Sequence, residues 1–170
     1  MEERDPGDGA GLWAPPAPGK LIGRGHAIGD FLQADQWDVL EQRTGCLRVL
    51  ADLPPAVLNL RGELFGGFTP TYVDFIAIHT WWAGQTPRPG HPWLATLNLR
   101  CEYFAPVRGP RVVIEGRVLR RLGSTSFIEV RFLPPEAGLE SGSLSGPSSR
   151  EIPAGEEDLL VYASATLKAL

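Results

Sequence analysis

The sequence predicts an α+β fold in which one antiparallel sheet wraps a single long helix. Strand-like segments surround one long apolar segment at residues 68–84, and residues 94–104 alternate apolar and polar side chains. Turn residues separate neighbouring strands. Because a hairpin precedes the helix and an antiparallel meander follows it, the strands can form one sheet with its apolar face on the helix.

The first two strands are predicted at residues 37–41 and 47–51. The turn Arg43-Thr44-Gly45 joins them as a hairpin. Pro54-Pro55 ends the second strand, because proline cannot donate a ladder hydrogen bond.

Two polar segments are expected outside this core. Residues 1–20 are acidic and rich in Gly and Pro, which predicts a disordered tail before a single domain at residues 21–170. Within that domain a short helix is expected at residues 26–32. Residues 134–156, rich in Gly, Ser and Pro, are expected to form a disordered insert.

The central helix is predicted to begin at Thr69-Pro70 and to end near Gly84. The threonine hydroxyl can cap a helix, proline fits the first turn, and glycine is common just past a helix end. Apolar residues cover most of its circumference, which is typical of a helix buried in a core.

Four more strands are expected, at residues 94–104, 112–121, 126–133 and 159–168. In the first of these, alternation predicts one buried face and one opposite face. The buried face is expected to hold Ala95, Leu97, Leu99, Cys101 and Tyr103, and the opposite face Thr96, Asn98, Arg100 and Glu102.

Composition argues against several classes of function. A formal net charge of −4 gives little support for nucleic-acid binding, and no apolar run reaches the roughly 18 residues of a membrane span. The N-terminus lacks the basic start of a signal peptide, so a cytoplasmic protein is expected. Cys46 and Cys101 fit reduced, buried cysteines, and His26, His79 and His91 lack the spacing of metal ligands.

Asp74 is the only charged residue between Phe68 and Gln85. Carboxylates are rarely buried without a partner, and sequences break the core pattern mostly where function requires it. Asp74 is therefore a candidate catalytic base, the alternative being a side chain that caps a loop or pairs with an arginine.

Gly66 and Gly67 directly precede the predicted helix. Glycines there allow a ligand to approach backbone N–H groups, and a helix start carries partial positive charge. Such donors could form an oxyanion hole, although a simple tight turn explains the same pair.

These residues carry a resemblance to the PaaI-type acyl-CoA thioesterases, a hotdog-fold family. The family signature has an Asn, a Gly-Gly loop, and a helix with an Asp seven residues after the second Gly, and it is similar to NLRGELFGGFTPTYVDFIAIHT. The matching positions are Asn59, Gly62, Gly66, Gly67 and Asp74, and further on Pro106, Gly109 and Gly123. The resemblance covers residues 37–168 without the insert, and it implies a hotdog fold.

The resemblance also implies roles for four catalytic residues. Asp74 would be the general base for water or a nucleophile, the Gly66 N–H would polarise the thioester carbonyl, Asn59 would orient the carbonyl or the water, and Thr96 would hold the water. The family site lies across the interface of a homodimer or homotetramer, with Asp74 facing Asn59 and Gly66 of the other subunit. No cofactor is implied, because CoA is part of the acyl-CoA substrate.

Two departures from the family pattern affect the predicted substrate contacts. Phe65 stands where the family has His, and Ser124 stands where a basic residue often follows the turn glycine. Arg120 and Arg121 could supply that charge for CoA, or could be a solvated pair at a strand end. The predicted substrate-binding residues are Phe65, Gly67, Arg120, Arg121, Gly123 and Ser124.

Two other functions remain open for such a chain. One is a hotdog protein that binds acyl-CoA or an acyl carrier without hydrolysing it. The other is a MaoC-type hydratase, which uses an Asp and a His five residues later, the spacing of Asp74 and His79. On a helix these two side chains diverge by about 140°, so they are not expected to converge on one substrate.

Overall fold

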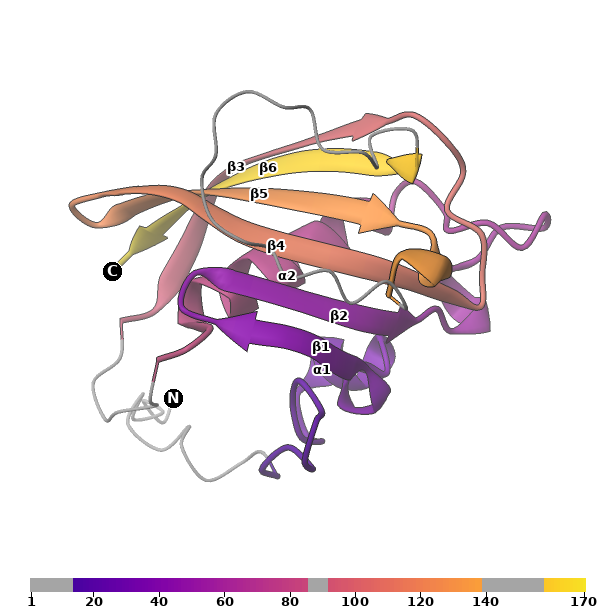
Figure 1. Cartoon of the computed structure of the whole chain (residues 1–170), viewed down its shortest axis with the longest axis horizontal. Helices are drawn as coiled ribbons and strands as arrows, with labels where there is room; N and C mark the ends of the chain where they lie inside the picture. Colours follow the sequence, from indigo (N-terminus) through magenta and orange to yellow (C-terminus); the bar gives the residue numbers. More distant parts are fainter. Residues whose placement is uncertain (1–13, 86–91, 139–157) are drawn as a thin grey trace, which may run out of the picture.

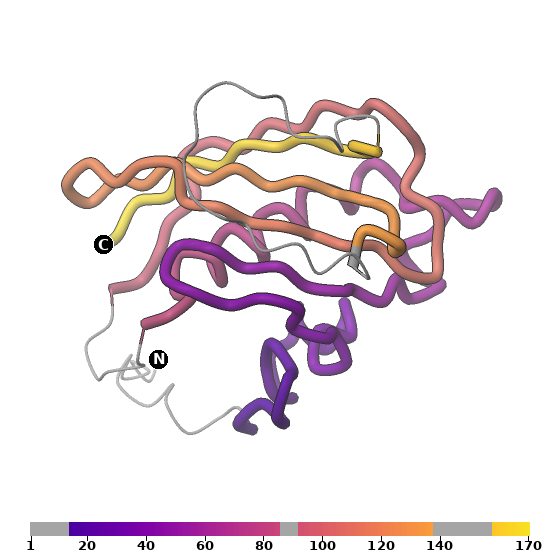
Figure 2. Tube along the Cα trace, viewed as in Figure 1, coloured from indigo at the N-terminus to yellow at the C-terminus, as the bar shows by residue number. Residues whose placement is uncertain are grey.

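The computed structural model describes residues 14–85, 92–138 and 158–170, and shows one curved sheet around one long helix (Figures 1 and 2). This arrangement confirms the predicted α+β class and the wrapped helix. The helices in chain order are α1 (Ala27–Phe31), η2 (Ala34–Gln36), η3 (Pro55–Val57), α2 (Thr69–Trp82) and η4 (Pro135–Gly138). The strands are β1 (Asp38–Arg43), β2 (Cys46–Asp52), β3 (Leu94–Tyr103), β4 (Arg111–Leu122), β5 (Thr125–Leu133) and β6 (Val161–Ala169).

The sheet has the strand order β1-β2-β4-β5-β6-β3, and every neighbouring pair is antiparallel. The β1–β2 hairpin is confirmed, and β4, β5 and β6 form a meander. β3 does not join that meander next to β4, but pairs with β6 at the far edge (Figure 1). β1 and β3 are therefore the two edges of the described sheet.

One face of α2 packs on the sheet. Its buried residues include Tyr72, Val73, Ile76, Ala77 and Thr80, at the spacing of a single helix face. The helix lies very close to Gly116 of β4, where an added Cβ would lie 1.9 Å from Thr80 Oγ1. Only glycine allows the helix to lie this close to the strand. The other face of α2 is not covered by the sheet.

The ends of α2 differ in part from the prediction. The helix begins at Thr69, but the N-cap residue is Phe68 and no side chain caps the helix. Thr69 is buried as the first helical residue, so the capping role expected for its hydroxyl is wrong. Pro70 lies in the first turn and Gly84, with φ +71°, follows the last turn, as expected.

A β-bulge in β3 changes which side chains face α2. Thr96 pairs with Leu167 of β6 and Asn98 with Thr166, so Leu97 is an extra residue. Leu167 is buried against the helix, so its partner Thr96 also faces the helix side, whereas Leu97 is 56% exposed. Ala95 pairs with the exposed Lys168, so the strict alternation predicted for this strand is wrong at Ala95, Thr96 and Leu97.

The segments expected to be disordered lie only partly within the described residues. Gly19 accepts a hydrogen bond from Val39 N (2.8 Å), and Lys20 forms an ion pair with Asp38 (2.6 Å), so contacts with β1 begin before residue 21. Residues 1–13 lie outside the described chain. Of the expected insert, η4 is described and its Ala137 carbonyl accepts a hydrogen bond from Arg48, while residues 139–157 lie outside.

Candidate active site

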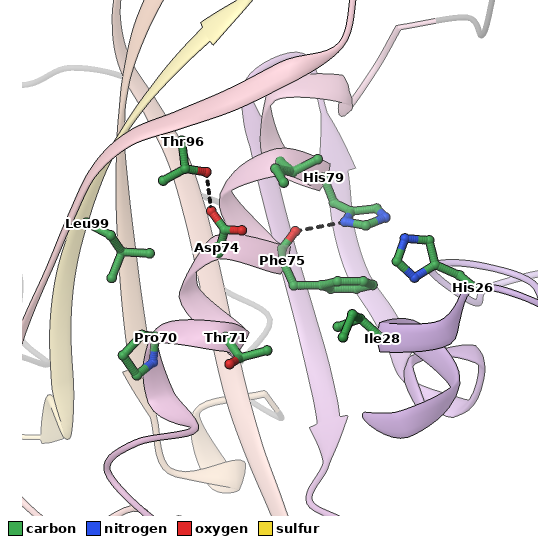
Figure 3. A pocket seen from close by; sticks show the side chains of 10 residues that line it. His26, Ile28, Pro70, Thr71, Asp74, Phe75, His79, Thr96 and Leu99 are labelled. Carbon is green, nitrogen blue, oxygen red and sulfur yellow. Dashed lines mark hydrogen bonds between the residues drawn. The ribbon is translucent and has the colours of Figure 1, made fainter. Parts of the chain in front are cut away.

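A pocket lies on the face of α2 that the sheet leaves uncovered (Figure 3). Its volume of about 530 Å³ falls within the range of pockets that hold small molecules. Residues of α2 form the floor, β3 forms one wall, and α1 with its N-cap forms the other. The lining residues are His26, Ile28, Pro70, Thr71, Asp74, Phe75, Ile78, His79, Thr96 and Leu99.

Asp74 and Thr96 meet in this pocket. The Thr96 hydroxyl donates a short hydrogen bond of 2.5 Å to Asp74 Oδ1. The contact depends on the bulge at Leu97, since regular alternation would place Thr96 on the outer face. Asp74 is half-buried on the open stripe of α2, so the expectation that it lies within a fully covered helix is wrong. Within the described residues it makes no ion pair with an arginine.

The Gly-Gly loop borders a second, smaller pocket at the start of α2. This pocket of about 350 Å³ is lined by Leu64, Gly66, Thr69, Tyr103, Phe104, Ala105, Pro106 and Val107. The Tyr103 hydroxyl donates a hydrogen bond of 2.9 Å to the Gly66 carbonyl. Because a peptide unit is planar, this bond also fixes the direction of the Gly67 N–H, on the opposite side of the same peptide. The two pockets share no residue.

Asn59 organises the loop that precedes the Gly-Gly pair. Its Oδ1 accepts hydrogen bonds from Arg61 N (2.8 Å) and Glu63 N (3.1 Å), and its Nδ2 donates to the Glu63 carboxylate (3.3 Å). Phe65 is 56% exposed and its ring makes an edge contact with Phe68. Neither Asn59 nor Phe65 lines the Asp74 pocket of its own chain.

Arg120 and Arg121 lie on opposite faces of β4. Arg120 pairs with the exposed Phe127, whereas Arg121 pairs with the buried Ser126, next to α2. Arg121 stacks over the Trp81 ring (5.0 Å) and donates a hydrogen bond to the Trp81 carbonyl (3.1 Å). Arg121 is thus bound to the end of α2, and a contact of either arginine with CoA stays a prediction.

The β4–β5 turn holds the other two residues predicted to contact CoA. Gly123 has φ +56°, a conformation that favours glycine, and Ser124 follows it. The turn lies at the opposite end of the sheet from the Gly-Gly loop (Figure 1). Neither residue lines the pocket that contains Asp74.

His79 lines the Asp74 pocket, but from its other side. Its Nδ1 lies 2.8 Å from the Phe75 carbonyl, and burial lowers the pKa of the imidazole to about 4. The neutral ring therefore donates from Nδ1. The two side chains share a pocket, yet Asp74 points toward Thr96 and His79 toward His26 (Figure 3). This divergence agrees with the expectation that weighed against a MaoC-type dyad.

Among residues 14–85, 92–138 and 158–170, no three His, Cys, Asp or Glu side chains are grouped as a metal site would require. In the same part of the chain, no helix has the length and apolar character needed to cross a bilayer.

Comparison with known proteins places this geometry in a family context. Residues 61–139, which hold the Gly-Gly loop, Asp74 and Thr96, match the family model of the thioesterase superfamily. The predicted resemblance to thioesterases is confirmed. No curated protein matches the chain in sequence.

Solved thioesterase structures share the fold. Thioesterase superfamily member 2 from zebrafish is 19% identical, with a TM-score of 0.60 over 85% of this chain and 91% of that one. A phenylacetic acid degradation-related thioesterase from Ralstonia eutropha is 17% identical, with a TM-score of 0.59 over 91% and 92%. A hypothetical thioesterase from Streptococcus pneumoniae with coenzyme A is 16% identical, with a TM-score of 0.58 over 80% and 87%. These likenesses confirm the hotdog fold.

Sequence reasoning missed part of this thioesterase-like arrangement. Tyr103 was expected only to pack, although its place at the end of the apolar face of β3 puts a hydroxyl near the helix start. His26 and Ile28 belong to a helix too short to show a pattern that would link it to the pocket. No local signal relates α1 to α2.

Proposed function

We propose that this protein hydrolyses acyl-CoA thioesters to a free acid and coenzyme A. The observation that carries the proposal is the Asp74–Thr96 hydrogen bond in the pocket on the open face of α2. A carboxylate held this way can accept a proton from an attacking water, or attack the thioester itself. Both roles remain in the proposal for Asp74.

In the general-base route, water supplies the new bond. The water oxygen bonds to the thioester carbon while its proton passes to Asp74, and Thr96 helps to hold the water. The carbonyl oxygen becomes an oxyanion, for which the N–H groups of Gly66 and Gly67 at the start of α2 are suitable donors. The C–S bond then breaks, and the CoA thiolate takes up the proton as it leaves.

The complete site is proposed to form between two copies of the chain. In one protomer the Asp74 pocket and the Gly66 pocket are separate. The β3 edge beside both is unpaired in the described sheet. It exposes Leu97 (56%), and the residues just before and after the strand, Trp93 (73%) and Phe104 (65%), are exposed as well. Because a long apolar edge favours pairing with another chain, a homodimer or homotetramer would cover it and let Asp74 face Gly66 and Asn59 of the other subunit.

Similar proteins support the proposed substrate. The Streptococcus pneumoniae thioesterase was solved with coenzyme A, and also as variants in which an Asp or a Thr is replaced by Ala, the residue types of Asp74 and Thr96. CoA is then part of the substrate, and no separate cofactor is proposed. We retain Arg120, Gly123 and Ser124 as proposed CoA contacts, and a cytoplasmic location, for which the unpaired Cys46 and Cys101 are suitable.

A panel of acyl-CoAs with free-thiol detection tests the proposal. Asp74→Asn keeps the size of the side chain but removes the base, so turnover is expected to fall by roughly 100- to 10,000-fold. Asp158→Asn makes the same chemical change at an exposed position outside the pocket and should match the wild type. Equal rates for Asp74→Asn and the wild type would remove Asp74 from the mechanism.

A second function is favoured by one residue. Phe65 cannot form the hydrogen bonds of the family histidine, so the protein could bind acyl-CoA or an acyl carrier without cleaving it. In that case the wild type retains acyl-CoA in equilibrium binding and releases no thiol from any member of the panel.

A further inference from the structure

We propose that α1 sets the acyl specificity of this site, and that the pocket holds an apolar acyl group of medium size between Ile28 and Phe75. The inference rests on the proposed function and adds a substrate class to it. It follows from the distribution of polar and apolar groups in the Asp74 pocket, from the way α1 is fixed, and from the pocket volume.

The pocket has one polar region and one apolar region. The reacting carbonyl must lie within reach of Asp74 and Thr96, which meet beside β3. From there the pocket extends toward α1, where Phe75 and Ile28 provide apolar surface (Figure 3). An acyl group whose carbonyl lies at Asp74 can therefore extend over Phe75 to Ile28.

The α1 side of the pocket favours an uncharged acyl group. His79, on that side, is neutral near pH 7, and its Nδ1–H is occupied by the Phe75 carbonyl. The charge of Asp74 would also repel a second carboxylate in the acyl group. Acyl groups that end in a carboxylate, such as succinyl, should therefore bind poorly.

The wall formed by α1 is held in a fixed position against α2. His26 Nδ1 accepts a hydrogen bond from Gly29 N (3.0 Å), and its ring makes an edge contact with Phe75 at 5.9 Å between centroids. At the other end of α1, Phe31 packs on Phe68 with 5.8 Å between centroids. These contacts hold α1 against α2, and Ile28, which is 47% exposed, lines the pocket on that side.

The volume of the pocket and the position of α1 in the sequence both suit a role of α1 in acyl specificity. About 530 Å³ is much more space than an acetyl group fills, so a small acyl group would leave Ile28 and Phe75 without contacts. Residues 27–31 also lie outside the segment 61–139 that matches the thioesterase family model. Asp74, Thr96 and Gly66 lie inside that segment, so the wall belongs to a different part of the chain from these groups.

Ile28→Trp tests the inference by filling the pocket beside α1. We compare kcat/KM for acetyl-, butyryl-, octanoyl-, phenylacetyl- and succinyl-CoA in the wild type and the variant. The wild type should prefer octanoyl- or phenylacetyl-CoA to acetyl- and succinyl-CoA. Ile28→Trp should reduce kcat/KM for the larger apolar acyl groups by roughly 10-fold or more, and leave the acetyl-CoA value nearly unchanged.

Two controls separate specificity from a folding defect. Leu40→Trp adds similar bulk at an exposed position of β1 outside the pocket lining and should preserve the ratio of octanoyl- to acetyl-CoA rates, even if all rates fall. Ile28→Ala removes the apolar contact without blocking the pocket and should lower that ratio by less than Ile28→Trp. An equal fractional change for every acyl group in both Ile28 variants would overturn the inference.

Failure of the proposed function gives a different result. If the wild type releases no thiol, hydrolysis is wrong and the same variants are compared by calorimetric titration with octanoyl-CoA and free CoA. Ile28→Trp must then weaken octanoyl-CoA binding and leave free CoA binding unchanged. Equal weakening of both ligands, or of neither, would show that α1 does not contact the acyl group.

Discussion

The middle and the start of α2 provide two different kinds of chemistry. In the middle, the pocket depends on side chains, since Asp74 from the helix meets Thr96 from an edge strand. At the start, the pocket depends on backbone groups of Gly66 and Gly67, and on Tyr103, which binds the Gly66 carbonyl. A thioesterase needs both a base and an oxyanion site, and one protomer keeps them in separate pockets. Under the proposed function, the base and the oxyanion donors would therefore have to come from two copies of the chain.

The largest effect is expected from mixing two inactive variants, which tests whether Asp74 and Gly66 act from different subunits. Asp74→Asn removes the base, and Gly66→Pro removes an N–H donor, so each alone should lose at least roughly 100-fold in turnover. If the site crosses the interface of a two-fold dimer, subunits that are unfolded and refolded together should regain roughly a quarter of the wild-type activity, because hybrid dimers contain one intact site.

Each variant refolded alone is the control for that experiment. A mixture that stays as inactive as its components, although hybrid dimers are detected by native mass spectrometry, would mean that Asp74 and Gly66 act within one chain.

A smaller effect is expected from Tyr103, which acts on the backbone pocket alone. Tyr103→Phe keeps the ring and loses the hydrogen bond to the Gly66 carbonyl, so the Gly66–Gly67 peptide is less well oriented toward an oxyanion. We expect kcat to fall by roughly 10-fold while KM is nearly unchanged, because the contact acts in the transition state. Steady-state kinetics with the preferred acyl-CoA measures both constants.

Tyr162→Phe is the matched control, since Tyr162 lies on β6 between residues that face α2 and therefore points away from the helix. If Tyr103→Phe raises KM with kcat unchanged, the hydroxyl contributes to substrate binding and not to orientation of the glycine peptide.

The smallest effect is expected on the pH dependence of stability, and it concerns only the pocket in the middle of α2. Burial lowers the pKa of His79 from 6.5 to about 4, so the unfolded chain takes up this proton before the folded chain does. The titration of His79 therefore lowers the free energy of unfolding as the pH falls from about 6.5 to about 4. His79→Gln keeps a donor for the Phe75 carbonyl and removes the titration, so the variant should lose less stability on acidification.

Urea unfolding at pH 7 and at pH 4.5 measures the difference between the two proteins. A decrease in the free energy of unfolding that is the same for both would show that His79 titrates normally in the folded chain.

The fold was largely predictable because its signals are local. Apolar segments and the positions of proline and glycine predicted where α2, the β1–β2 hairpin and the turn at Gly123 lie, and the observed positions are close to these. Asp74 could be found because one charge in an apolar helix is visible in the sequence. Whether it acts as the proposed base stays a prediction.

The remaining features depend on pairing between distant strands. Register with partner strands far along the chain sets three features. These are the β3 bulge, the irregularity between Val118 and Arg120, and the placement of β3 beside β6. No local pattern gives that register. For the same reason, the contact between α1 and the pocket could not be predicted from residues 27–31 alone.

The extra residue at Leu97 determines which β3 side chain faces Asp74, because one added residue reverses which positions of the strand point toward the helix. A related chain with one residue fewer in this strand would turn its threonine to the outside, even if every other residue were the same. A chain with a different residue at position 97 would keep the threonine in place. When sequences of this kind are compared, a gap in the edge strand is therefore more informative than any substitution at the bulge itself.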